Sequence, residues 1–174
     1  VAALLDELER SGRPVRVLLT PGAASQLGRA WHDDHPTCCH VQLHYLSHLP
    51  QTEFDRLLWC CDLNLVRGED SATRALWASH PHVWNIYPQD DGVHAYKLDA
   101  FMDRWMAEWP EDLKQAVQSL WRAWNGLGPL SGLGSLNSLL DDPRWIECAQ
   151  KSLSKLAEIP DLVTQLDEFV IRSS

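Results

Sequence analysis

The chain has 174 residues, enough for one domain with a hydrophobic core, and 45% of them are hydrophobic, which excludes a disordered protein. The formal net charge of −9 would repel a phosphate backbone, so we expect no general nucleic-acid binding. No apolar run approaches the roughly 20 residues of a membrane helix, and acidic residues interrupt any N-terminal signal peptide.

The five cysteines comprise two adjacent pairs and one single residue: Cys38, Cys39, Cys60, Cys61 and Cys148. An odd count arranged in this way is a poor disulfide framework, because adjacent cysteines rarely pair with each other or close long loops. We therefore expect a protein of a reducing, cytoplasmic compartment, with no membrane partner.

The first half of the chain alternates between helical and strand patterns. A helix is expected at the start of the chain, ending at Ser11-Gly12. Apolar runs predict strands at 15–20, 41–46, 63–66 and 82–87. Helical patterns follow Pro50 and Ser71. This alternation predicts an α/β fold with a mostly parallel sheet, connected by right-handed crossovers.

In such a sheet, ligands bind beyond the carboxyl ends of the strands. The loops at those ends cover 21–22, 48–51, 67–71 and 88–92, and functional residues are sought there. A doubly wound sheet begins with a strand, whereas this chain begins inside a helical pattern. We therefore expect an N-terminal strand, and a preceding domain, to be absent from the chain.

The second half of the chain is helical. Helices are predicted at 94–109, 111–124, 143–157 and 161–171, the last two with a proline near the start. The Gly-, Ser- and Leu-rich stretch at 127–138 is predicted to be a loop with little order. We divide the chain into an α/β core at 1–125 and a helical tail at 126–174.

The loop at 67–71 has the composition of an anion-binding turn. Arg67 and Gly68 follow a strand, and Glu69, Asp70 and Ser71 lead into a helix. A glycine lets a phosphate approach the backbone, the helix N-terminus offers unpaired N–H groups, and arginine matches phosphate geometry. The same pattern also fits an ordinary helix cap by Asp70 or Ser71.

Two neighbouring loops offer further candidates. Gln51 could hydrogen-bond a base edge and Phe54 could stack on a base, although Phe54 also shares a helix face with core leucines. Tyr87, at a strand end, could direct its hydroxyl into the same crevice, or could belong to a turn containing Pro88.

One histidine- and cysteine-rich segment raises the question of zinc. Its members are His32, His35, Cys38, Cys39 and His40. These residue types are zinc ligands, but their spacing is unlike that of common structural zinc sites, and no second pair lies at a matching distance. We expect a histidine-rich loop and no metal.

Several motifs occur together in a fixed order: LPQTEFDRLLW at 49–59, VRGEDS at 66–71, and IYPQD at 86–90 after Trp84. In combination they resemble the EarP family of protein-arginine rhamnosyltransferases, which modify bacterial elongation factor P (EF-P). The resemblance covers residue 1 to about residue 104 well and the helical tail only loosely. Two departures are His48, where an aromatic residue is common, and Ala72-Thr73, which replaces a bulkier apolar pair.

The resemblance implies a Rossmann-like domain that is the C-terminal, donor-binding half of an inverting GT-B glycosyltransferase. The donor would be dTDP-β-L-rhamnose and the acceptor one arginine of EF-P. Gln51 and Phe54 would hold the thymidine, while Arg67, Gly68, Asp70, Ser71 and Tyr87 would hold the ribose and diphosphate. Glu69 matches a glutamate that the family needs for catalysis.

Inverting transfer to a guanidinium needs a base, because this group stays protonated in water. By the resemblance, the family's acceptor-side aspartates lie in the N-terminal domain, so this chain alone is expected to be inactive. No cofactor or metal is expected, because Arg67 and helix amides can balance the charge of the diphosphate. The alternative is a non-enzymatic module of the same fold that binds a nucleotide sugar or a protein partner.

Overall fold

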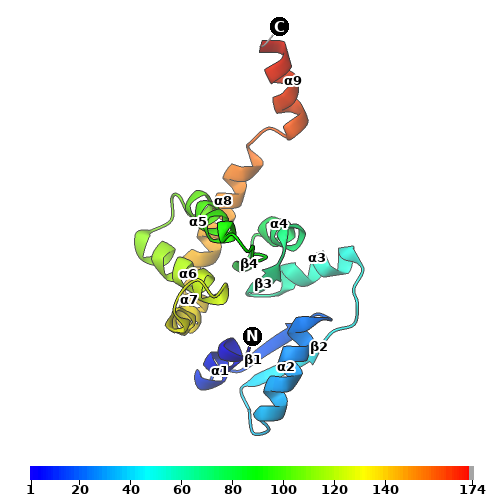
Figure 1. Ribbon diagram of the computed structural model, residues 1–174, viewed down its shortest axis with the longest axis vertical. Helices are drawn as coiled ribbons and strands as arrows, with labels where there is room; N and C mark the ends of the chain where they lie inside the picture. The colour runs from blue at the N-terminus through cyan, green and yellow to red at the C-terminus, as the bar shows by residue number, and fades with distance from the viewer. Residues whose placement is uncertain (173–174) are drawn as a thin grey trace.

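The computed structural model describes residues 1–172 and shows an α/β fold whose strands form two parallel pairs (Figure 1). Strand β1 (Val15–Leu19) pairs with β2 (Val41–Tyr45), and β3 (Asn64–Arg67) pairs with β4 (His82–Asn85). The strand positions and their parallel direction confirm the prediction. The expectation of a single sheet is wrong for the described residues, because β1 and β3 do not hydrogen-bond to each other.

The four helices in the first half of the described chain pack against each other in two pairs. Helix α1 (Ala2–Arg10) contacts α2 (Ala23–Asp34), and α3 (Gln51–Cys60) contacts α4 (Glu69–Trp77). Helix α2 was not predicted from sequence patterns, and its buried residues are only Gly28 and Trp31. Each pair of helices accompanies one pair of strands, as expected for consecutive strand–helix–strand units.

The second half of the chain is helical, and all but its last helix pack around the main hydrophobic core. It comprises α5 (Val93–Trp105), α6 (Glu111–Trp124), the 3₁₀ helix η1 (Leu130–Ser135), α7 (Leu136–Leu140), α8 (Pro143–Ala157) and α9 (Leu162–Arg172). Trp121 of α6 and Trp145 of α8 are among the largest fully buried side chains. No helix among residues 1–172 is long and apolar enough to cross a membrane.

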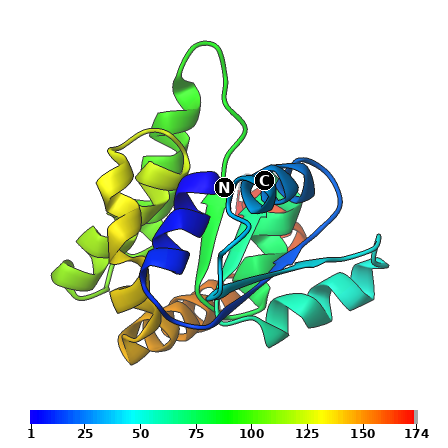
Figure 2. The same cartoon turned by 90° about the horizontal axis from the view of Figure 1, so that it is seen from below.

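The stretch at 127–138 corrects a sequence prediction. It contains η1 and the start of α7, and Leu133 and Leu136 are buried in the main core. Gly132 lies so close to α6 that a Cβ there would be 2.6 Å from the carbonyl oxygen of Ser119. The glycine therefore permits close packing. Figure 2 shows η1 and α7, in yellow, beside α1.

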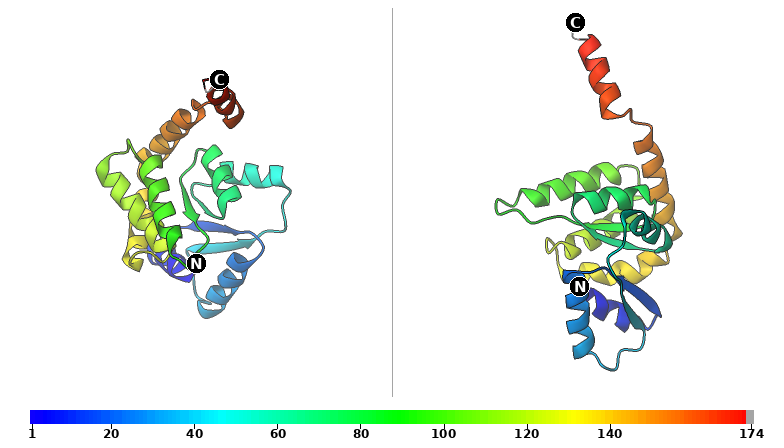
Figure 3. Two further views of the ribbon diagram at one scale, coloured as in Figure 1. Left: turned by 45° about the horizontal axis from the view of Figure 1, so that its top comes forward. Right: turned by 90° about the vertical axis from the view of Figure 1, so that its right-hand side faces the viewer.

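Helix α9 projects away from the rest of the molecule in both views of Figure 3. Several of its apolar side chains are exposed, among them Leu162 and Val163 at about 70%. The predicted helix at 161–171 is thus present, but none of its described side chains belongs to the buried core.

Candidate functional site

The turn between β3 and α4 is built around Gly68, the N-cap residue of α4. Its backbone angles, φ 80° and ψ 168°, lie in a region that is essentially restricted to glycine. A Cβ at this position would also lie 2.9 Å from Cε2 of Tyr87. Gly68 is therefore required for both the backbone conformation and the approach of the Tyr87 ring.

The backbone N–H groups in the first turn of α4 have no hydrogen-bond acceptor within residues 1–172. The carbonyl of Gly68 accepts the first helical bond, from the N–H of Ala72. Among residues 1–172, no acceptor meets the N–H groups of Glu69, Asp70 and Ser71, as is usual for the first helical residues. No side chain caps the helix, so the alternative of an ordinary cap by Asp70 or Ser71 is wrong.

Arg67 ends β3 and lies over the ring of Tyr87, with 5.0 Å between the guanidinium carbon and the ring centroid. Tyr87 follows β4 and is 51% exposed. Because β3 and β4 are parallel neighbours, their carboxyl ends bring these two residues together. A cation–π contact of this kind orients an arginine while leaving its N–H groups available to an anion.

Helices α3 and α4 are joined by Arg74, whose importance was not recognised from the sequence. Its Nη1 donates to both carboxylate oxygens of Asp55, at 2.8 and 2.9 Å, and its Nε lies 3.4 Å from Oδ2 of Asp70. With the amide oxygen of Gln51 turned toward it, Arg74 also donates to Gln51 through Nε, at 2.8 Å, and through Nη2. The hydrogen bonds that Arg74 donates to the Asp55 carboxylate are the main cause of the raised pKa of Arg74.

Gln51 is therefore held at the start of α3 by an arginine from the neighbouring helix. The motif at 49–59 and the arginine at 74 are separated in the sequence, and only the packing of α3 on α4 brings them together. A signal was nevertheless present, because Asp55 and Asp70 supply two acids for one cation.

Phe54 has two environments. It packs against a small cluster of buried residues beneath α3 and α4, namely Leu58, Val66, Ala72, Ala75 and Ala78. It also lines a cleft of about 1270 Å³, together with Arg67, Ser71 and His48. The structure thus places Phe54, Arg67 and Ser71 on the cleft. Gln51, Gly68, Glu69, Asp70 and Tyr87 lie outside its lining, although Gly68, Glu69 and Asp70 flank Arg67 and Ser71 in the chain.

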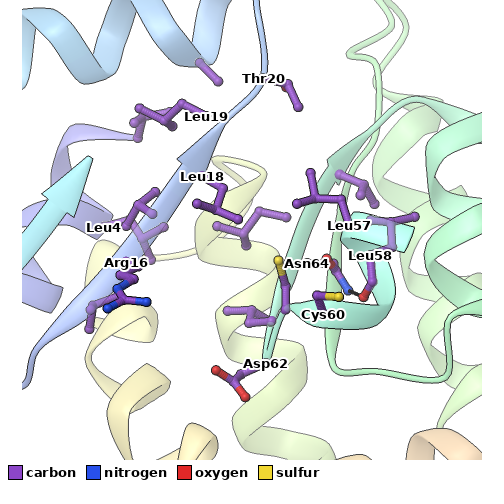
Figure 4. A pocket seen from close by; sticks show the side chains of 18 of the residues that line it. Leu4, Arg16, Leu18, Leu19, Thr20, Leu57, Leu58, Cys60, Asp62 and Asn64 are labelled. Carbon is purple, nitrogen blue, oxygen red and sulfur yellow. Dashed lines mark hydrogen bonds between the residues drawn. The ribbon is translucent and has the colours of Figure 1, made fainter. Parts of the chain in front are cut away.

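The cleft separates the two pairs of strands. Figure 4 shows Leu18 of β1 and Leu57 of α3 extending toward it from opposite sides. Thr20, Arg67 and Ser71 line it at the carboxyl ends of the strands, the edge where ligands of α/β sheets bind. A second polar group lines it near the amino ends of β1 and β3, namely Arg13, Arg16, Asp62 and Asn64.

The histidine- and cysteine-rich loop also contains a cluster, in which ligand atoms of Glu9, Cys39 and His40 lie within 4.8 Å of one another. The backbone N–H groups of Cys39, Val41 and His40 donate to the Glu9 carboxylate, and these bonds, that of Cys39 foremost, lower its pKa to about 2. Glu9 therefore holds the start of β2. The expectation that no metal binds here stays a prediction.

Comparisons with known proteins agree on one family. A family described as "Elongation-Factor P (EF-P) rhamnosyltransferase EarP" matches residues 1–171. A protein-arginine rhamnosyltransferase of Pseudomonas aeruginosa is 42% identical over 130 residues, which cover 74% of this chain and 34% of the relative. One of Shewanella oneidensis is 43% identical over 145 residues, covering 76% of this chain and 34% of the relative.

A solved structure is also similar over the whole chain. It is described as "Structural basis for EarP-mediated arginine glycosylation of translation elongation factor EF-P". The TM-score is 0.78 at 31% identity, and the match covers 100% of this chain and 57% of the other. The chain thus spans about a third of the length of the curated relatives named above, and just over half of the solved chain.

Proposed function

The chain belongs to the EarP family of EF-P rhamnosyltransferases, and we propose that it is the donor-binding half of an inverting GT-B enzyme of this kind. In the full-length protein it would bind dTDP-β-L-rhamnose, and the rhamnose would be transferred to an arginine of EF-P. The whole of 1–174, α/β core and helical tail together, would form the Rossmann-like donor domain.

The main structural support is the turn from β3 to α4. It combines an arginine fixed over Tyr87, a glycine at the helix N-cap and three open amides at Glu69, Asp70 and Ser71. A diphosphate carries negative charge on several oxygens, and such a turn offers it N–H donors together with a positive charge. We assign the diphosphate to Arg67 and these amides.

The rest of the donor would extend along α3 and the end of β4. Gln51 is held by Arg74 at the start of α3, and Phe54 lines the cleft one turn later, so both can contact a thymidine. The hydroxyls of Tyr87 and Ser71 and the carboxylate of Asp70 are suited to the ribose and diphosphate oxygens. Glu69 is exposed at the same turn and could accept hydrogen bonds from the sugar.

In the proposed reaction, an arginine nitrogen of EF-P forms a bond to the anomeric carbon of rhamnose. The bond from that carbon to the β-phosphate oxygen breaks, and dTDP leaves with both electrons. The proton lost from the guanidinium passes to a carboxylate base, which we assign to the part of the longer proteins outside the matched residues. Arg67 and the α4 amides would stabilise the departing diphosphate.

The decisive test is the intact mass of EF-P after incubation with dTDP-rhamnose and the full-length protein. We expect a gain of one deoxyhexose, and a decrease of about 10²–10³-fold in rate for Arg67→Ala, as when one charge-stabilising group is removed. Glu69→Gln should also decrease the rate. Arg104→Ala, an exposed arginine on α5, is the matched control and should leave it unchanged.

Nucleotide binding, measured alongside transfer to EF-P, distinguishes an enzyme from a non-enzymatic binding module. Calorimetry should show a preference for dTDP over UDP and GDP that is lost in Arg67→Ala and Glu69→Ala. If the full-length protein binds dTDP but adds no mass to EF-P, the binding-module alternative is favoured. If neither binding nor transfer is found, the proposed function is wrong.

A further inference from the structure

One group of metal-ligating side chains lies away from the proposed donor site. Among residues 1–172, ligand atoms of Glu9, Cys39 and His40 come within 4.8 Å of one another. Glu9 lies in α1, whereas Cys39 and His40 directly precede β2, about thirty positions later in the chain. The expectation that this loop binds no metal was drawn from the spacing of residues 32–40, which does not include Glu9.

The three ligand atoms are spaced like the corners of one face of a tetrahedral metal site. Nδ1 of His40 lies 3.1 Å from Oε1 of Glu9, and Sγ of Cys39 lies 3.7 Å from that oxygen and 3.4 Å from Nδ1. With usual zinc–ligand bond lengths, tetrahedral geometry separates nitrogen from oxygen by about 3.4 Å, and sulfur from either by about 3.6 Å. The observed distances agree to within about 0.3 Å, so one ion can contact all three atoms.

The carboxylate of Glu9 is held in position by the backbone at the start of β2. Its oxygens accept the N–H groups of Cys39, His40 and Val41 at 2.9, 3.0 and 2.8 Å. Hydrogen bonds of this kind orient a metal ligand before the ion arrives. Because a carboxylate offers about four acceptor positions, three N–H donors leave one for an ion.

The ligand types favour Zn²⁺. A thiolate and an imidazole suit zinc, whereas Mg²⁺ and Ca²⁺ prefer oxygen ligands. On binding, the Cys39 thiol would lose its proton to solvent, so that one thiolate and one carboxylate balance the two charges of the ion. Cys39 is exposed and Glu9 and His40 are half-buried, so the ion can enter from solvent and keep a water as its fourth ligand.

We propose that Glu9, Cys39 and His40 form a Zn²⁺ site, with a water molecule in the fourth position. This proposal replaces the expectation that was based on spacing alone. The ion would join α1 to the start of β2 and stabilise that contact. The site lies at the amino end of β2, whereas the proposed donor site lies at the carboxyl ends of the strands, so the ion would take no part in rhamnose transfer.

The test is calorimetric titration of the reduced, full chain with Zn²⁺ at about pH 8, where an imidazole is neutral. We expect one ion per chain, with release of about one proton, measured by comparing buffers of different ionisation enthalpy. Cys39→Ser and His40→Gln should each weaken binding by at least about 100-fold, the upper end of the effect of losing a residue that only supports a ligand. Cys38→Ser, which changes the adjacent thiol outside the cluster, is the matched control and should bind like the wild type.

Co²⁺ supplies a second measurement, because a thiolate ligand gives a charge-transfer band and tetrahedral coordination gives strong visible absorption. Both should be lost in Cys39→Ser and kept in Cys38→Ser. Cys39 is exposed, so its substitution should leave the fold intact, whereas Glu9 is left unchanged because it also holds the start of β2. Absence of Zn²⁺ binding by the folded wild type would overturn the proposal. Equal binding by Cys38→Ser and Cys39→Ser, or binding lost in Cys60→Ser, would also overturn it.

Discussion

Tyr87 is the side chain on which the geometry of Gly68 and Arg67 depends. Its ring fills the space above Gly68 and underlies the guanidinium of Arg67 at 5.0 Å. Tyr87→Phe keeps the ring and should change dTDP affinity only by the loss of one hydroxyl contact. Tyr87→Ala releases Arg67 and should weaken affinity further, by about 0.5–1 kcal/mol for the lost cation–π contact at an exposed site. Calorimetry on the two variants measures the difference, and equal affinities would contradict this role.

Substitution of Gly68 tests the backbone conformation of the same turn. Gly68→Ala should destabilise the fold by about 1–3 kcal/mol, the usual cost of a glycine-only conformation. It should also displace the Tyr87 ring, so dTDP affinity falls together with the free energy of unfolding in urea. Ala72→Gly, on the same helix but facing the small core, should lower stability without changing the turn. A Gly68→Ala chain with wild-type stability and affinity would be inconsistent with the described backbone.

His82 is a buried histidine whose protonation opposes folding. It lies between Trp105 and Trp121, and its Nδ1 lies 3.3 Å from the carbonyl of His80. Burial lowers its pKa from 6.5 to about 4, with the His80 carbonyl opposing the shift. The unfolded chain therefore binds the proton more tightly. Stability should be complete above pH 6.5 and fall by about 3 kcal/mol as the pH decreases toward 4.

The measurement is the free energy of unfolding in urea between pH 7.5 and 4. His82→Leu should remove this part of the pH dependence, while His44→Gln, at an exposed position on β2, should retain it. The lowered pKa of Glu9, about 2 against an ordinary 4.5, places most of its contribution below pH 4.5, so it overlaps only the acidic end of this window. If His82→Leu shows the wild-type slope between pH 6.5 and 4, another group carries the dependence.

At the scale of elements, Arg74 links α3 to α4 and so connects the two parts of the candidate donor site. Lysine keeps the charge but cannot form the two bonds to Asp55 while also reaching Gln51. We expect Arg74→Lys to lower stability by about 1–2 kcal/mol and to weaken dTDP binding, because the start of α3 is released. Arg56→Lys, whose ion pair with Glu53 lies within α3, is the matched control. Equal effects of the two substitutions would argue against a link between the helices.

At the scale of the whole molecule, the sequence allowed prediction of local features, such as strands and turns, but not of how the strands pair. Apolar runs bounded by turn residues located all four strands, and Gly68 marked the turn that carries the candidate site. The separation into two pairs was not predictable, because strand pairing is set by contacts between distant parts of the chain and not by local sequence patterns. The segment around Gly132 was predicted to be a loop, because glycine is common in loops. The structure shows that this glycine instead permits a close contact between helices.

The charge balance of the proposed donor site also leads to a prediction for the complete enzyme. Arg67 and the open amides at the start of α4 supply positive potential within the chain, where other transferases use a divalent cation. We therefore expect EF-P modification by the full-length protein to proceed at the same rate in EDTA as in Mg²⁺. The rate is followed by the intact mass of EF-P.

The matched variant for this experiment is Arg67→Ala, because it removes the charge that makes a cation unnecessary. If Arg67 supplies the charge by direct contact, added Mg²⁺ should not restore the lost rate, because a hydrated cation does not reproduce the N–H donors of the guanidinium held over Tyr87. A wild-type enzyme that stops in EDTA and recovers with Mg²⁺ would contradict the assignment. The diphosphate charge would then be balanced by a metal, and Arg67 would have a role in orienting the donor alone.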